Sequence, residues 1–105
     1  MTTRYEQLEK LHAADPADAD VTYMIAMEHT KPDADDPSAV IDWLDKTLAL
    51  DENYLYAYFQ KAKAQSALDN DDQATATLQL GIQKANAAGD AKAVSELSEL
   101  MASME

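Results

Sequence analysis

Residues 40–48 read VIDWLDKTL, and residues 74–82 read ATATLQLGI. The two stretches start 34 residues apart, and each repeats an apolar side chain at every fourth position. The first set is Val40, Leu44 and Leu48, and the second is Ala74, Leu78 and Ile82. A spacing of four places each set on one face of a helix. A fixed period of this length is typical of repeat arrays, in which each unit buries its apolar face only against its neighbours.

Composition limits the fold to one small helical domain. The chain has 105 residues, of which 47% are apolar, with two glycines and three prolines. This length allows one continuous core but not two. No cysteine is present, which excludes disulfides, thiol catalysis and thiolate metal sites. The sequence opens on polar residues and contains no apolar run long enough to cross a membrane, so we expect a cytoplasmic protein.

The charge balance is strongly acidic, with eight basic residues against twenty acidic ones and a net charge of −12. Nucleic acid and anionic membranes are therefore not expected partners, because phosphate binding requires clusters of Lys and Arg. Two interpretations of the acidic surface remain open: it keeps the protein soluble, or it attracts a basic partner. Most aspartates fall between the apolar stretches, where they can cap helices.

The spacing of apolar residues, together with residues that begin or end helices, predicts six helices and no strand. Five helices are expected at about residues 2–14, 18–30, 37–50, 53–68 and 90–104, and another follows a turn at residues 69–71 and runs to about residue 87. Thr3 and Glu6 form a capping box, Asp36 precedes a proline at the first helical position, and Gly89 is a C-terminal glycine. In the first helix, we expect Leu8 and Leu11 to share one buried face with Tyr5.

The stretch from Tyr56 to Ile82 resembles the tetratricopeptide repeat. The matching residues are Tyr56-Ala57-Tyr58-Phe59, Ala62, Leu68-Asp69-Asn70, Ala74, Leu78 and Gly81-Ile82. A weaker match precedes it at Tyr23, Ile25-Ala26, His29, Val40, Leu44 and Thr47-Leu48, with a loop longer by two residues. The resemblance implies an all-α, right-handed superhelix of antiparallel helix pairs. It divides the single domain into a leading helix (2–14), repeat one (18–52), repeat two (53–88) and a C-terminal capping helix (90–104).

Three positions depart from the family pattern. Glu52 and Asn86 replace the proline that usually ends a repeat, and Lys61 replaces a leucine. A lysine at such a position can pack its aliphatic stem while its charge reaches water.

The resemblance also implies a concave groove, lined by the first helix of each pair and used to hold extended ligands. The groove positions are Asp20, Tyr23, Met27, Thr30 and Lys31 in repeat one, and Tyr54, Tyr56, Phe59, Lys63 and Ser66 in repeat two. We expect partner binding at Tyr23, Met27, Tyr54, Tyr56, Phe59 and Lys63, because tyrosine and methionine are common interface anchors. Alternatively, these aromatic residues pack against the final helix.

Some family members grip an acidic C-terminal peptide with a clamp of Lys, Asn and Arg. This chain lacks that set, because Met27 stands at the asparagine position and few lysines are near. A partner with basic and apolar residues suits the charge better.

Catalytic and metal chemistry have little support in the sequence. The two histidines, His12 and His29, are not spaced to hold a metal together on one helix turn and have no nucleophile at a meaningful spacing. A calcium loop beginning at Asp69 would need glycine and glutamate where Ala74 and Leu80 stand. We therefore expect no cofactor, no metal and no enzymatic activity, and we expect His29 to pack in the core.

Two functional hypotheses follow. The first is an adaptor that binds a peptide or protein segment in the groove. The second is a self-associating structural unit, although amphipathic first and last helices would cap the array and favour a monomer. Trp43 lies beside the apolar line of its helix. It either packs on the first helix or is partly exposed as a second contact.

Overall fold

The computed structural model describes residues 3–104, which form six helices. The helices are α1 (Arg4–Ala14), α2 (Ala19–Glu28), α3 (Pro37–Leu50), α4 (Leu55–Ala67), α5 (Asp71–Ala88) and α6 (Ala91–Ser103). The expected all-helical fold is therefore confirmed, since no strand occurs within residues 3–104. Thr2, the first residue of the expected leading helix, lies outside the described residues.

Side-chain caps set the starts of four helices. Thr3 accepts a hydrogen bond from the amide of Glu6 at 3.1 Å, as the capping box predicts. The aspartates before α2, α3 and α6 likewise accept hydrogen bonds from amides of the first turn: Asp18, Asp36 and Asp90. These bonds satisfy amide groups that have no partner within the helix. Part of the acidic surplus therefore has a local structural role.

Two chain reversals use left-handed backbone. Gly89 ends α5 with a φ of 71°, a conformation that glycine adopts without steric cost. Asp69, in the turn between α4 and α5, has a φ of 61°. Aspartate is among the few other residues that tolerate this region. The turn at residues 68–70 is thus tight, whereas α2 and α3 are joined by the longer segment 29–36.

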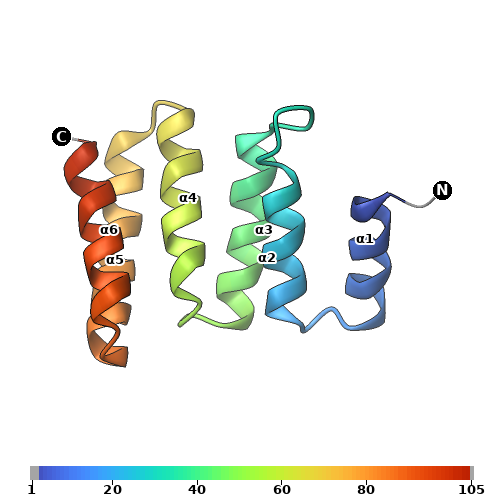
Figure 1. Cartoon of the computed structure of the whole chain (residues 1–105), viewed down its shortest axis with the longest axis horizontal. Coiled ribbons are helices and arrows are strands. Elements are labelled where there is room, and N and C mark those ends of the chain that lie inside the picture. The colour runs from blue at the N-terminus through green and yellow to red at the C-terminus, as the bar shows by residue number, and fades with distance from the viewer. Residues whose placement is uncertain (1–2, 105) are drawn as a thin grey trace.

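The helices run alternately up and down in an elongated array of 43 × 28 × 19 Å (Figure 1). The array consists of two helix pairs, α2 with α3 and α4 with α5, flanked by α1 and α6. In Figure 1, α2 and α6 lie in front of α3 and α5. Within residues 3–104, no helix is long and apolar enough to span a membrane.

The repeated apolar line forms the centre of the core. Val40, Leu44, Ala74 and Leu78 are each at most 2% exposed, and Leu48 and Ile82 are half-buried beside them. Between the repeats, α4 packs against both α3 and α5. The period of 34 therefore corresponds to equivalent burial in consecutive helix pairs.

The core of the first pair also contains a polar contact. The hydroxyl oxygens of Thr22 on α2 and Thr47 on α3 lie 2.8 Å apart, and both residues are fully buried. Each hydroxyl also lies within hydrogen-bond distance of a carbonyl on its own helix, that of Ala19 or Trp43. The buried polar groups are thus satisfied, as burial requires.

The expected face of the first helix is only partly correct. Leu8 is buried, but Leu11 is 52% exposed. The contact of α1 with the array continues through His12, which meets the ring of Trp43 edge-on at 5.2 Å between centroids. Histidine and tryptophan thus cover the area that a leucine at position 11 was expected to cover. Trp43 packs on the first helix and is also half-buried rather than fully buried, so the two alternatives for it do not exclude each other.

Helix α2 is shorter than expected, because it ends at Glu28 rather than near residue 30. His29, its C-terminal cap, is half-buried, and its ring meets that of Tyr5 edge-on at 5.3 Å. His29 therefore packs against other residues, as expected, but it is only half-buried and its contact is with α1.

Candidate functional site

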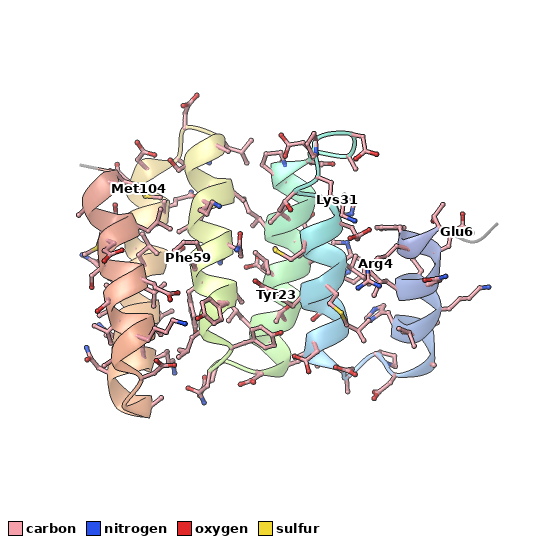
Figure 2. The ribbon with its side chains drawn as sticks, in the orientation of Figure 1. Arg4, Glu6, Tyr23, Lys31, Phe59 and Met104 are labelled. Carbon is pink, nitrogen blue, oxygen red and sulfur yellow. The ribbon has the colours of Figure 1, made fainter. Side chains whose placement is uncertain are left out.

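The face formed by α2, α4 and α6 carries most of the predicted groove residues. This face, which the resemblance predicts to be the concave one, lies toward the viewer in Figure 2, with Tyr23 between α2 and α4 and Phe59 between α4 and α6. The rings of Tyr23 and Tyr54 stack at 5.0 Å between centroids, with an interplanar angle of 29°. The structure therefore brings two predicted residues, one from each repeat, into direct contact.

The stacked pair is held by a hydrogen bond between the repeats. The hydroxyl of Tyr54 donates to Oδ1 of Asp20 at 2.8 Å, and the two residues are separated by one repeat length of 34. Burial, followed by this hydrogen bond and the charge of Asp20, raises the pKa of Tyr54 well above its ordinary value of 10.0. Burial also raises the pKa of Tyr23. Both tyrosines are therefore neutral donors at physiological pH.

A hollow of about 420 Å³ opens beside this pair, between α2 and α4. Its lining is mostly apolar: Met27, Pro37, Val40, Ala64 and Ala67, with Thr30, Asp35, Gln60 and Lys63 among the polar residues. Two small residues of α4, Ala64 and Ala67, leave this space open. The long segment between α2 and α3 contributes Asp35 to the lining. The predicted residues Met27 and Lys63 thus meet in one site.

A second hollow of about 320 Å³ lies between α4 and α6 and is lined by Phe59, Glu96, Glu99 and Leu100. Phe59 is half-buried against the cluster that includes Leu97 of α6. Phe59 therefore packs against the final helix, which was one of the two alternatives for the aromatic residues of the groove. The two glutamates were missed, because the sequence comparison assigned groove positions only within the two full repeats.

Three other predicted groove residues lie apart from the hollows. Tyr56 is 45% exposed near the start of α4. Lys31 pairs with Glu28 at 2.9 Å and lines a separate depression beside Arg4 of α1 (Figure 2). The hydroxyl of Ser66 donates to Asp71 at 2.9 Å, which joins the end of α4 to the start of α5. Of the three side chains, that of Tyr56 is exposed and forms no hydrogen bond with the described residues.

Comparison with known proteins identifies the array. No protein-family model and no curated protein matches the chain. Among solved structures, the solution structure of a tetratricopeptide repeat domain protein from Salinibacter ruber matches at 30% identity and a TM-score of 0.78. The match covers 87% of this chain and 90% of that chain. The chain belongs to the tetratricopeptide repeat family. A crystal structure of the tetratricopeptide repeat domain protein from the same organism matches at 29% identity and a TM-score of 0.74, covering 83% and 94% of the respective chains.

The most unusual position of this tetratricopeptide repeat protein is Lys61. Its side chain is 23% exposed, and its Nζ lies 2.7 Å from Oδ1 of Asp45 on α3. The stem packs while the charge reaches a surface partner, as expected for a lysine at an apolar position. Lysine in place of the leucine of the family pattern therefore allows an ion pair between α4 and α3.

Within residues 3–104, no group of three or more His, Asp or Glu residues is arranged to hold a metal ion. His12 and His29 each have a buried ring nitrogen without a hydrogen-bond partner in the described structure, His12 Nδ1 and His29 Nε2. Both rings pack on aromatic side chains at the interface with α1. In this tetratricopeptide repeat protein, the two histidines thus contribute packing rather than a shared site.

We expect the stability of this tetratricopeptide repeat protein to decrease at alkaline pH partly through Tyr54. The folded state holds the Tyr54 proton more tightly than the unfolded state does, because its pKa is raised on folding. This contribution is fully present below pH 10.0 and is lost as pH rises above it. Denaturant unfolding of wild type and Tyr54→Phe across this range measures the effect. The variant should lose less stability than wild type above pH 10.0, and parallel pH profiles would contradict the assignment.

Proposed function

We propose that this chain is a non-catalytic adaptor that binds an extended segment of another protein along its concave face. The fold supports protein interaction as the general role, because stacked helical repeats present extended concave binding surfaces. The observation that carries the finer proposal is the open hollow between α2 and α4. It combines an apolar lining with a few polar groups, which is the usual character of a binding pocket.

The lining indicates how a segment would be held. An apolar side chain of the partner enters the hollow and contacts Met27, Val40 and Ala64. Gln60 and Thr30 supply polar groups for the partner's backbone. The stacked rings of Tyr23 and Tyr54 give the neighbouring part of the face a rigid shape, because their geometry is fixed by the bond to Asp20. Little rearrangement is then needed on binding.

Charge favours a segment that is also basic. The chain carries a net charge of −12, and the two hollows present Asp35, Glu96 and Glu99. Lys63 is the one cation that lines either hollow. A basic segment gains from the overall field and from these carboxylates, and only Lys63 opposes it. An acidic segment would be repelled by the same field.

A peptide-display selection against the full chain tests both parts of the proposal. The enriched peptides are expected to combine Lys or Arg with a large apolar residue. Lys63→Glu should tighten their binding about threefold to tenfold, because it removes the opposing charge and adds a favourable one. Ala67→Leu should abolish most of the binding, because the added side chain fills the hollow. Fluorescence anisotropy of labelled peptides measures both changes.

The matched control is Ala87→Leu. Ala87 is an exposed alanine near the end of α5, as Ala67 is at the end of α4, but Ala87 does not line the hollow. It should leave binding unchanged. Equal losses in the two leucine variants would argue against the hollow. Enrichment of acidic peptides, or weaker binding to Lys63→Glu, would argue against a basic partner while leaving groove binding intact.

A further inference from the structure

A third hollow lies on the opposite side of the array from the concave face. It has a volume of about 430 Å³ and is lined by residues of α3, the α3–α4 connection, α4 and α5: Asp45, Leu48, Glu52, Tyr58, Lys61, Thr77, Leu80 and Lys84. The second helices of the two pairs, α3 and α5, form its sides. Groove binding does not use this surface, which we call the convex hollow. The unusual Lys61 is one of its residues.

The convex hollow joins a recess to a protruding apolar side chain. Leu48 and Tyr58 line the recess, and the Tyr58 hydroxyl is held by the carbonyl of Glu52 at 2.6 Å. Leu80 stands at the same place and is 45% exposed, which makes it one of the most exposed large apolar residues described. When two copies of such a surface face each other, they are complementary in shape, because the leucine of each copy can enter the recess of the other.

The charges around the convex hollow are also self-complementary. Lys61 pairs with Asp45 at 2.7 Å, and Lys84 pairs with Glu52 at 3.5 Å. Two cations and two anions cancel, so the net charge of −12 comes entirely from other parts of the chain. Since the chain as a whole is acidic, a second copy meets charge of the same sign over much of the remaining surface, although the depression lined by Arg4, Glu28, Lys31 and Asp33 is also balanced. At the convex hollow, each lysine finds a carboxylate on the opposing copy.

We propose that the convex hollow is the contact surface of a two-fold symmetric dimer of this chain. A two-fold interface uses the same patch on both copies and therefore requires self-complementary shape and charge. Leu80 of each copy enters the recess beside Leu48 of the other. The ion pairs of Lys61 and Lys84 extend across the contact. The concave faces point away from the dimer contact and remain open to a protein segment.

The ends of the array are less suited to this role. Leu8 of α1 and Leu97 of α6 are turned inward and are at most 2% exposed, and Leu11 is the one large apolar side chain of α1 that is exposed. The outer surface of α1 consists mainly of exposed polar residues. The dimer thus forms through the sides of the helix pairs rather than by end-to-end stacking.

Sedimentation velocity of the full chain over a wide range of protein concentration tests the dimer. The salt concentration should be about 0.15 M, which screens repulsion between distant charges. Wild type should shift from monomer to dimer as concentration rises. Leu80→Asp should weaken the association about tenfold or more, because it places two carboxylates in the recesses. Since Leu80 is exposed, the fold should persist, and circular dichroism checks this.

The matched control is Leu68→Asp. Leu68 is 40% exposed, close to Leu80 in exposure, but it lies at the end of α4 outside the convex hollow. It should associate as wild type does. Equal weakening in both variants, or wild type that remains monomeric at every concentration, would overturn the proposal.

A charge exchange supplies a second test. Lys84→Glu and Glu52→Lys should each dimerise poorly alone, because like charges then face each other across the two-fold axis. A mixture of the two variants should recover the dimer, because each altered residue then meets an opposite charge. Failure of the mixture to associate better than either variant alone would also overturn the proposal.

Discussion

Leu78→Ala is expected to lower the free energy of unfolding by about 2–5 kcal/mol. Leu78 is fully buried on α5, in the cluster that joins α4, α5 and α6. Truncation removes apolar contacts and leaves a cavity among three helices whose backbone positions are fixed by neighbours on both sides. Because stability in a repeat array depends on the interfaces between adjacent units, the loss affects the whole cooperative unit.

Chemical denaturation followed by circular dichroism measures this change. Leu50→Ala is the matched control, because Leu50 is a leucine at the end of α3 that is 42% exposed. The control should change stability by well under about 1 kcal/mol, as expected for a surface substitution. Similar losses in the two variants would show that Leu78 is not a central core residue. The same burial predicts a comparable loss for Leu44→Ala, since Leu44 is the equivalent residue one repeat earlier.

Gly81→Ala is expected to destabilise the fold by about 1–3 kcal/mol, although alanine is the better helix former. A Cβ at position 81 would lie 2.8 Å from Cβ of Tyr58 and 3.4 Å from Cδ1 of Leu97. The Tyr58 Cβ is attached directly to the backbone of α4, so it cannot move aside without moving the helix. Glycine at this position therefore sets the close approach of α4 and α5.

Helix propensity acts against the steric effect at position 81, and Ala76→Gly measures its size. Ala76 is exposed in the interior of the same helix, so this change should cost about 1 kcal/mol through propensity alone. If propensity also dominated at position 81, Gly81→Ala would gain a similar amount. A gain of stability in Gly81→Ala would contradict the steric argument, and thermal or chemical denaturation of the three proteins decides between them.

The helices were predictable because their signals are local or periodic. The cap at Thr3, the Asp36–Pro37 start of α3 and the glycine at position 89 each act within a few residues of the chain. The boundaries of α3 agree with the prediction for this reason. Helix α2 was extended two residues too far, because its end at Glu28 carries no glycine or proline signal.

The predicted side-chain contacts were incomplete where a residue can pack against more than one helix that is distant in sequence. Leu11 has the right spacing to join Leu8, but α1 touches the array along a narrow strip, and His12 takes that place against Trp43. For Phe59 the sequence left two alternatives open, and the structure places its ring against α6 while it also lines the hollow between α4 and α6. Helical periodicity gives the direction of a side chain around its own helix, but not the neighbour that it meets.

The sequence predicted several residues of the hollow between α2 and α4, such as Met27 and Lys63, but not the shape or volume of any hollow. The one between α2 and α4 combines residues of α2, α3, α4 and the segment before α3. The convex hollow depends on the distance between α3 and α5, which are separated in sequence by the whole of α4. Both depend on how far neighbouring helix pairs rotate and separate, which is decided by the packed side chains between them.

Hydrophobic spacing and capping act along a single helix, so the amino-acid order alone was enough to predict the six helices, the period of 34 and buried lines such as Val40–Leu44 and Ala74–Leu78. Which surface residues meet depends on the assembled fold. The stacking of Tyr23 on Tyr54, the bond from Tyr54 to Asp20 and the ion pair of Lys61 with Asp45 each join different helices. These contacts depend on the angle and separation between helices, which no local sequence pattern encodes.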